Sequence, residues 1–239
     1  MSFHVNMLKQ VSNDRPRRRV ALVTLGQSSK EDSLVLEITS FLPKQTEVMV
    51  VGVLDGLTRE EVETKYAPLS PSRSFFTKMA DGDEVRVDRE FIHHRYKACI
   101  RSLDGTVDFI GVLCSGELPI LRTRTPLLIP NGLVQGCLTA LRSSRPWGIV
   151  MPTEESLRRM NQTLSRWRLK AVGCVLSPCS AQQKDIEHCA MILLQGRVSA
   201  VLLNCFGYTQ ETVEALQKIL AVPIVRVSSL FAHVLAELV

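Results

Sequence analysis

Aromatic side chains are scarce in this chain, because phenylalanine, tryptophan and tyrosine make up only 5% of its 239 residues. The interior therefore has to be filled mainly by leucine, valine, isoleucine and alanine. The hydrophobic share of 45% is enough for a large core. A chain of this length folds either as one large domain or as two smaller lobes.

Long apolar runs are also missing. No segment approaches the roughly 18 to 20 continuous apolar residues that a membrane-spanning helix needs. The short apolar stretch at residues 20–26 lacks the cleavage site of an export signal. We therefore expect no membrane partner and a cytoplasmic location.

Positive charge is concentrated in one place. The net charge is only +5, and much of it comes from the arginines within residues 15–19. Nucleic-acid binding needs a wider basic face, preferably with interleaved aromatic side chains, and the sequence has none. Residues 1–19 are therefore predicted to be a disordered basic arm, and no nucleic-acid partner is expected. If the arm did bind nucleic acid, binding would depend steeply on salt.

The short motifs of phosphate, dinucleotide and metal binding are absent. No lysine follows the glycine-containing segment 111–116, and no Gly-x-Gly-x-x-Gly follows the first apolar run. The chain also lacks the Gly-x-Ser-x-Gly elbow of serine hydrolases and the His-Glu-x-x-His pair of helical zinc sites. We therefore expect neither a cofactor nor a metal.

The seven cysteines do not match a disulfide framework or a zinc site. Their number is odd, and no export signal precedes them. Cys174, Cys179 and Cys189 lie near a histidine but lack the tight Cys-x-x-Cys spacing of a zinc knuckle. We predict that these three, like Cys99 and Cys137, are buried structural thiols.

Apolar runs alternate with amphipathic segments along the chain. The expected strands cover residues 20–25, 48–54, 107–113, 147–151, 172–176, 198–204 and 223–227. This alternation predicts an α/β fold with parallel sheets flanked by helices. We expect two Rossmann-like lobes, at residues 20–145 and 146–239, with the last helix packing back on the first lobe.

Local signals set several expected boundaries. Thr58 and Glu61 have the spacing of a helix-capping box, and Ser29 is a candidate N-cap. Residues 130–132 (Pro-Asn-Gly) are typical of a sharp turn. The Pro- and Ser-rich segment 67–82 is predicted to be a mobile flap.

Two cysteines occupy the same kind of position in the two halves. Cys114 follows the expected strand 107–113, and Cys205 follows the expected strand 198–204. In an open parallel sheet, the carboxyl ends of the strands line the ligand crevice. A helix that begins there favours anions and lowers the pKa of a nearby thiol. The pair is therefore the best candidate for a functional site.

Two thiols on opposite sides of a substrate carbon suit a stereo-inverting proton transfer. One, as thiolate, removes a proton, and the other, as thiol, returns one on the opposite face. The alternative is that two buried strands each end in a small hydrophobic residue. Spacing alone favours neither interpretation.

Several tracts resemble the AroM family. They are residues 24–28 (TLGQS), 57–62 (LTREEV) continuing to 66–68 (YAP), 148–155 (GIVMPTEE), 203–208 (LNCFGY) and the closing 236–238 (AEL). The similarity extends from about residue 20 to the C-terminus, and the tract at 57–68 is the most specific.

This resemblance implies an aspartate/glutamate racemase-like fold, with one cysteine from each lobe facing a central cleft and no cofactor. It implies that Cys114 and Cys205 are the catalytic pair. The candidate ligand-binding residues are the other polar and glycine positions at the expected strand ends and turns: Thr24, Gln27, Ser28, Ser115, Gly116, Asn131, Thr153, Gly207, Tyr208 and Thr209.

The resemblance leaves the activity open. The chain is expected to be a cofactor-independent racemase or isomerase of a small carboxylate. If the chemistry is nucleophilic attack, as in a decarboxylase or a cis–trans isomerase, Cys205 is the expected nucleophile. The alternative is a non-catalytic or regulatory protein that binds a small acid in the same cleft. Relatives of this superfamily also suggest a homodimer or a larger oligomer.

Overall fold

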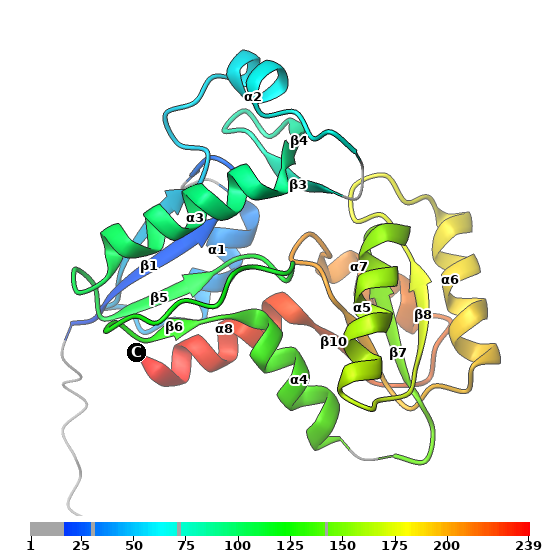
Figure 1. Ribbon diagram of the computed structural model, residues 1–239. Coiled ribbons are helices and arrows are strands. Elements are labelled where there is room, and N and C mark those ends of the chain that lie inside the picture. The colour runs from blue at the N-terminus through cyan, green and yellow to red at the C-terminus, as the bar shows by residue number, and fades with distance from the viewer. Residues whose placement is uncertain (1–16, 30–31, 71–72, 142) are drawn as a thin grey trace, which may run out of the picture.

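The computed structural model describes residues 17–29, 32–70, 73–141 and 143–239. Strands and helices alternate through it (Figure 1). The first half contains β1 (Arg19–Thr24), α1 (Ser33–Ser40), β2 (Glu47–Gly52), α2 (Arg59–Lys65), β3 (Ser74–Lys78), β4 (Glu84–Asp88), α3 (Arg89–Leu103), β5 (Phe109–Val112), β6 (Leu127–Leu128) and α4 (Pro130–Ala140). The second half contains β7 (Trp147–Met151), α5 (Glu154–Arg166), β8 (Ala171–Val175), α6 (Gln183–Gln195), β9 (Val201–Leu203), α7 (Gln210–Gln217), β10 (Ile224–Arg226) and α8 (Val227–Leu238).

The strands form two four-stranded parallel sheets. The first has the order β2-β1-β5-β6, and the second has the order β10-β9-β7-β8. The central strands β1 and β7 are almost continuously apolar and buried, as expected for sheets that are covered on both faces. The predicted α/β fold with two parallel sheets flanked by helices is confirmed.

The segment predicted to be a flap is instead largely a β-hairpin. Residues 71–72 of that segment lie outside the described residues. Strands β3 and β4 pair in antiparallel register, with Ser74 opposite Asp88 at one end and Lys78 opposite Glu84 at the other. The hairpin forms because one face is apolar. Phe75, Val85 and Val87 are buried in the same core cluster as side chains of α3.

Several helix starts differ from the expected ones. The carboxylate of Asp32, and not Ser29, caps α1, since it accepts the backbone N–H groups of two residues in the first turn. The expected turn at residues 130–132 is the first turn of α4, with Pro130 at a position where no N–H is needed. The capping box of Thr58 and Glu61 is confirmed.

Helix α8 returns to the first half of the chain. It packs against α1 and α4 (Figure 1). The ring of Phe231 on α8 is fully buried, and it lies so close to Gly111 of β5 that a side chain there would collide with it. One core cluster contains residues of both sheets, such as Leu22 and Ile149. The two sheets therefore share part of their core, and the division at residues 145 and 146 stays a prediction.

The basic arm is described only at its end. Residues 1–16 lie outside the described part. Arg17 forms an ion pair with Glu47 at 3.6 Å, Arg18 pairs with Asp108 at 3.8 Å, and Arg19 already begins β1. Among the described helices, none is both long enough and apolar enough to span a bilayer.

Candidate functional site

The two candidate cysteines follow neighbouring parts of the two sheets. Cys114 lies two residues after β5, and Cys205 lies two residues after β9. Both are free and partly exposed. The loops touch, because the hydroxyl of Ser115 donates a 3.0 Å hydrogen bond to the carbonyl of Asn204. The fold therefore brings the carboxyl edge of one sheet against the carboxyl edge of the other at these residues.

Each sulfur accepts a hydrogen bond from the backbone two residues further on. The N–H of Gly116 lies 3.2 Å from Cys114 Sγ, and the N–H of Gly207 lies 3.5 Å from Cys205 Sγ. The same local geometry thus occurs in both halves. A donor at a sulfur favours the thiolate and lowers the pKa of the thiol.

Burial outweighs these donors. Burial raises the pKa of Cys114 to about 12, although the Gly116 N–H and the nearby Arg89 oppose the shift. Burial also raises the pKa of Cys205, against the effect of the Gly207 N–H. In this arrangement, burial therefore acts against the expectation that a helix N-terminus makes a thiolate accessible near neutral pH.

The β3–β4 hairpin adds residues that the sequence analysis did not assign to the site. The ring of Phe75 lies so close to Gly116 that a Cβ on the glycine would be 2.7 Å from it. The charges of Glu84 and Lys78, which face each other across the hairpin, raise and lower the pKa of Cys205 respectively. The hairpin thus lies over both thiol loops.

Cys179 is a third thiol at this place. Burial, together with a hydrogen bond to the Glu84 carboxylate, raises its pKa to about 11. This residue is exposed and was predicted to be a buried structural thiol, so that prediction is wrong. The reason is that residue 179 lies in the turn between β8 and α6, at the rim that the hairpin reaches.

Helix α3 contributes a positive charge on the Cys114 side. The guanidinium of Arg89 lies 5.1 Å from the centre of the Phe75 ring and 3.8 Å from the Glu117 carboxylate. His93, one turn further along α3, has a ring nitrogen 3.1 Å from the Glu117 carbonyl, and burial lowers its pKa. The sequence signal for Arg89 and His93 would have been the alternation of apolar and charged residues in β4, directly before α3.

Two of the predicted ligand-binding residues support the thiol loops. The side-chain amide of Asn131, at the start of α4, donates to the carbonyl of Gly116 at 3.2 Å. The hydroxyl of Thr24 accepts the N–H of Gly26 at 3.4 Å, at the end of β1. Asn131 therefore contacts the Cys114 loop directly, whereas Thr24 shapes the loop after the first strand.

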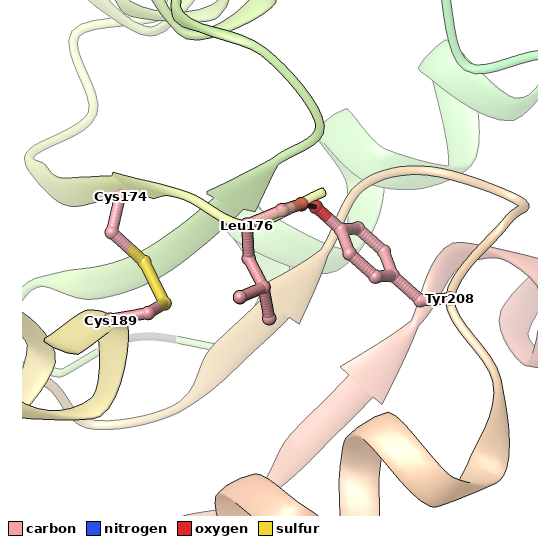
Figure 2. The surroundings of a disulfide bond; sticks show 4 residues. All are labelled: Cys174, Leu176, Cys189 and Tyr208. Carbon is pink, nitrogen blue, oxygen red and sulfur yellow. Dashed lines mark hydrogen bonds between the residues drawn. A yellow bond between two sulfur atoms is a disulfide. The ribbon is translucent and has the colours of Figure 1, made fainter. Parts of the chain in front are cut away.

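Tyr208 and Thr209 follow Cys205, and their side chains are already engaged. The Tyr208 hydroxyl is buried and donates to the carbonyl of Leu176 at 2.8 Å (Figure 2). The Thr209 hydroxyl interacts with Glu211. Thr153, after β7, forms a capping box with Ser156 at the start of α5. These side chains support the loops in this arrangement, and their roles as ligand-binding residues stay predictions.

Cys174 and Cys189 correct another expectation. They were predicted to be separate buried thiols, but they form a disulfide between β8 and α6 (Figure 2). Packing of α6 on β8 brings the two Cα atoms to 5.7 Å, a distance that suits a disulfide. Within the described part of the chain, no three His, Cys, Asp or Glu side chains cluster as a metal site would require.

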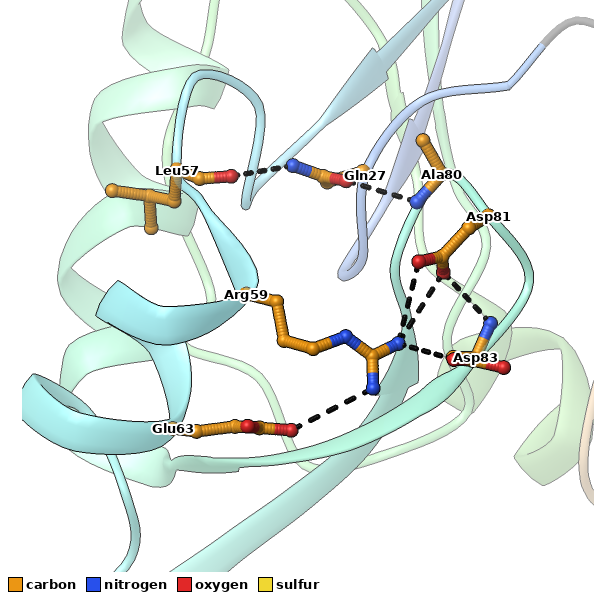
Figure 3. A network of polar contacts seen from close by, with 7 residues as sticks. All are labelled: Gln27, Leu57, Arg59, Glu63, Ala80, Asp81 and Asp83. Carbon is orange, nitrogen blue, oxygen red and sulfur yellow. Dashed lines mark hydrogen bonds and ion pairs between the residues drawn. The ribbon is translucent and has the colours of Figure 1, made fainter.

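Gln27 and Ser28 form contacts within the protein. The amide of Gln27 donates to the Leu57 carbonyl at 2.7 Å and accepts the N–H of Ala80 at 2.9 Å (Figure 3). The N–H of Ser28 donates to the Asp55 carboxylate at 2.7 Å. The Gln27 side chain thus bridges Leu57 and the hairpin, and its predicted ligand contact stays a prediction.

The open grooves described on the surface lie away from the thiols. One of about 1070 Å³ includes Trp147 and Arg168, at the amino-terminal edge of the second sheet. Another of about 400 Å³ includes Leu69 and Arg86. At the thiols, the hairpin packs on the Cys114 loop through Phe75 and reaches Cys179 through Glu84.

Comparison with solved structures supports the fold. The chain is similar to an allantoin racemase from Klebsiella pneumoniae, with a TM-score of 0.61, 15% identity, and coverage of 92% of this chain and 87% of that chain. It is also similar to a glutamate racemase from Aquifex pyrophilus (0.56, 13%, 92% and 84%) and to an unliganded arylmalonate decarboxylase (0.55, 13%, 92% and 92%). At these identities, the likeness shows the fold alone.

The sequence comparison gives the family. No curated protein sequence matches the chain. The family model described as AroM protein matches residues 20–239, which include both sheets and both thiol loops. The chain therefore belongs to the AroM family.

Proposed function

We propose that this protein is a cofactor-independent racemase or isomerase of a small carboxylate, with Cys114 and Cys205 as its acid/base pair. The observation that carries the proposal is the matched pair of free thiols. Each follows a strand of its own sheet and accepts the N–H two residues on, and Ser115 joins the two loops. The racemase fold of the similar structures is consistent with this chemistry.

The reaction requires one thiol to be deprotonated. The thiolate removes the proton on the carbon next to the substrate carboxylate, so that a C–H bond breaks, an S–H bond forms and the electron pair stays on carbon. The other thiol then protonates that carbon from the opposite face and becomes the thiolate. Backbone N–H groups in the thiol loops and the charges of Arg89 and Lys78 provide favourable surroundings for the carboxylate.

The ligand-binding roles of the remaining predicted residues are part of this proposal. Ser115, Gly116 and Gly207 lie in the thiol loops, and Asn131 supports the first of them. We expect Ser28 and Thr209 to lie near the ligand as well. The protein acts in the cytoplasm in this proposal, as a homodimer or a larger oligomer.

The raised thiol pKa values favour a second candidate. A protein whose two thiols stay protonated and covered can bind a small acid without transforming it. Attack by Cys205 alone, as in a decarboxylase, would also need that thiol to ionise first.

The deciding experiment is proton NMR in deuterium oxide with a panel of amino, hydroxy and unsaturated dicarboxylic acids. Wild type, Cys114→Ser and Cys205→Ser are compared, and Cys137→Ser on α4 is the matched control. We expect one compound to exchange its α-proton with wild type and with the control, and with neither site variant.

The other outcomes separate the alternatives. Loss in Cys205→Ser alone would indicate a single nucleophile. If compounds bind but none exchanges or isomerises, the acid/base proposal fails and the binding protein is favoured.

A further inference from the structure

The β3–β4 hairpin spans the two halves of the site. Phe75 packs over the Cys114 loop at Gly116, near the base of the hairpin. Glu84, near its tip, is hydrogen-bonded to Cys179 in the second half of the chain and acts on Cys205. Figure 1 shows the hairpin extending from above α3 toward the segment between β8 and α6. One element of the first half therefore lies near thiols from both halves.

The turn of the hairpin is held by an arginine from a different element. Arg59, the first residue of α2, lies 2.6 Å from the Asp83 carboxylate and 3.3 Å from that of Asp81 (Figure 3). It also pairs with Glu63 on its own helix at 3.7 Å. The Asp81 carboxylate in addition accepts the N–H of Asp83 at 3.0 Å, which fixes the turn between the strands. The arginine thus ties α2 to the turn.

A second attachment comes from the loop after β1. The backbone N–H of Gln27 donates to the Lys78 carbonyl at 3.0 Å, and its side chain bridges Ala80 and Leu57. Gly26 approaches the same Lys78 carbonyl so closely that no side chain would fit. These contacts involve two of the tracts that resemble the AroM family, at residues 24–28 and 57–62, and neither Gln27 nor Arg59 has its side chain on a thiol.

We propose that the β3–β4 hairpin is a cover for the two-thiol site, and that Arg59 and Gln27 are the positioning residues that hold it closed. The inference rests on the site being at Cys114 and Cys205, but not on any particular reaction there. Because the hairpin packs on the Cys114 loop through Phe75 and carries Glu84 and Lys78 near Cys205, weakening its attachments should make both thiols more accessible. The attachments of the turn are exposed polar contacts, so their loss should loosen the hairpin without unfolding the protein, while Phe75, Val85 and Val87 stay packed on the core.

The experiment measures how fast each cysteine of the full-length chain reacts with iodoacetamide, with peptide mass spectrometry to assign the sites. The variants are Arg59→Gln and the double change Asp81→Asn with Asp83→Asn, which weakens the same contacts from the other side. Arg59→Lys tests partial rescue. Arg101→Gln, an exposed arginine in the last turn of α3, is the matched control.

We expect Arg59→Gln and the double variant to speed modification of Cys114 and Cys205 on the order of two- to tenfold, as suits the loss of an exposed ion-pair network. Cys137 and the Arg101→Gln protein should react as before, and Arg59→Lys should lie between. The pH at which modification of Cys205 becomes fast should also be lower in these variants than in wild type. Relief of burial lowers the pKa of this thiol, while Glu84 and Lys78, which shift that pKa in opposite directions, move away together.

Unchanged rates at Cys114 and Cys205 in both variants would overturn the proposal. An equal increase at Cys137 would also overturn it, because that pattern indicates general loosening and not an opening of the hairpin. The result does not depend on catalysis. If cysteine modification is faster in the variants but wild type exchanges no α-proton, the hairpin is still a cover and the proposed racemase activity is rejected.

Discussion

At the scale of single residues, the two candidate thiols show a conflict between burial and hydrogen bonding. Each has one backbone N–H directed at its sulfur, which favours the thiolate, but desolvation favours the neutral thiol more strongly. A reactive pair would need a ligand, or movement of the hairpin, to change that balance.

The raised pKa of Cys114 also predicts how stability depends on pH. An unfolded cysteine ionises near pH 8.5, whereas the folded residue ionises near 12. The folded state therefore keeps a proton that the unfolded state has lost, so this contribution to stability is complete below about pH 8.5 and is lost as pH rises toward 12. For this one group, the free energy of unfolding should fall by up to about 1.4 kcal/mol per pH unit within that range.

Urea unfolding of wild type and Cys114→Ser between pH 7 and 10 tests this. Cys99 and Cys179, whose pKa values burial raises to about 11, contribute in both proteins, so the variant should lose stability less steeply and still lose some. Equal slopes would show that Cys114 ionises as readily in the folded state as in the unfolded one.

The sequence predicted a thiol pair, but it did not reveal which side chains its neighbours contact. Tyr208 and Gln27 are polar residues at strand ends, a position typical of ligand contacts. Their partners, Leu176 and Ala80, are 32 and 53 residues away in the chain. No local pattern reveals a partner at that separation, so a supporting residue and a binding residue look alike in sequence.

At the scale of elements, the hairpin was the main one missed. Prolines 68 and 71 and several serines suggested an irregular segment, and the alternation of Val85 and Val87 with charged residues is short. Elements with strong local signals were easier: the capping box predicted the start of α2, and the apolar run of β7 predicted a buried strand with the observed bounds. The stability of a short antiparallel pair of strands depends on the surface it packs against, and that surface cannot be predicted from the local sequence.

Close contact between the β1 loop and the hairpin makes Gly26 sensitive to substitution. A Cβ at this position would collide with the backbone carbonyl of Lys78, which is not free to rotate away. We expect Gly26→Ala to lower the free energy of unfolding by about 1–3 kcal/mol, as at other overpacked sites. Urea unfolding of the variant and wild type measures this difference.

The matched change is Gly136→Ala in the interior of α4. Nothing lies within 4 Å of the position its Cβ would take. Because alanine is the better helix former, this variant should gain about 0.5–1 kcal/mol. A Gly26→Ala protein as stable as wild type would mean that the hairpin shifts freely to accept the new methyl group.

At the scale of the whole molecule, α8 joins the two sheets. Phe231 packs on Gly111 of the first sheet, and its ring centre lies 5.6 Å from that of Phe206, the residue after Cys205. Arg226, at the start of this helix, is paired at 2.6 Å with Glu37 of α1. The α/β fold with parallel sheets flanked by helices was predictable from the alternation of strands and helices, whereas these contacts between the halves depend on tertiary packing.

Removal of the Phe231 ring should therefore be costly. We expect Phe231→Ala to lower the free energy of unfolding by about 3–5 kcal/mol, because it empties a fully buried site. Phe76→Ala, which removes a half-exposed ring from β3, should cost less than about 1 kcal/mol. Similar losses for the two variants in denaturant unfolding would show that α8 does not contribute to a shared core.

The return of α8 has a consequence for synthesis. The first sheet emerges from the ribosome well before residues 227–238, so the apolar surface around Gly111 stays uncovered while the second half is being made. The early half of the chain should therefore be prone to aggregation and a client for chaperones until the last helix docks. Because Phe231 packs against Phe206, the residue after Cys205, the loop that carries this thiol gains that packing only once α8 has been made.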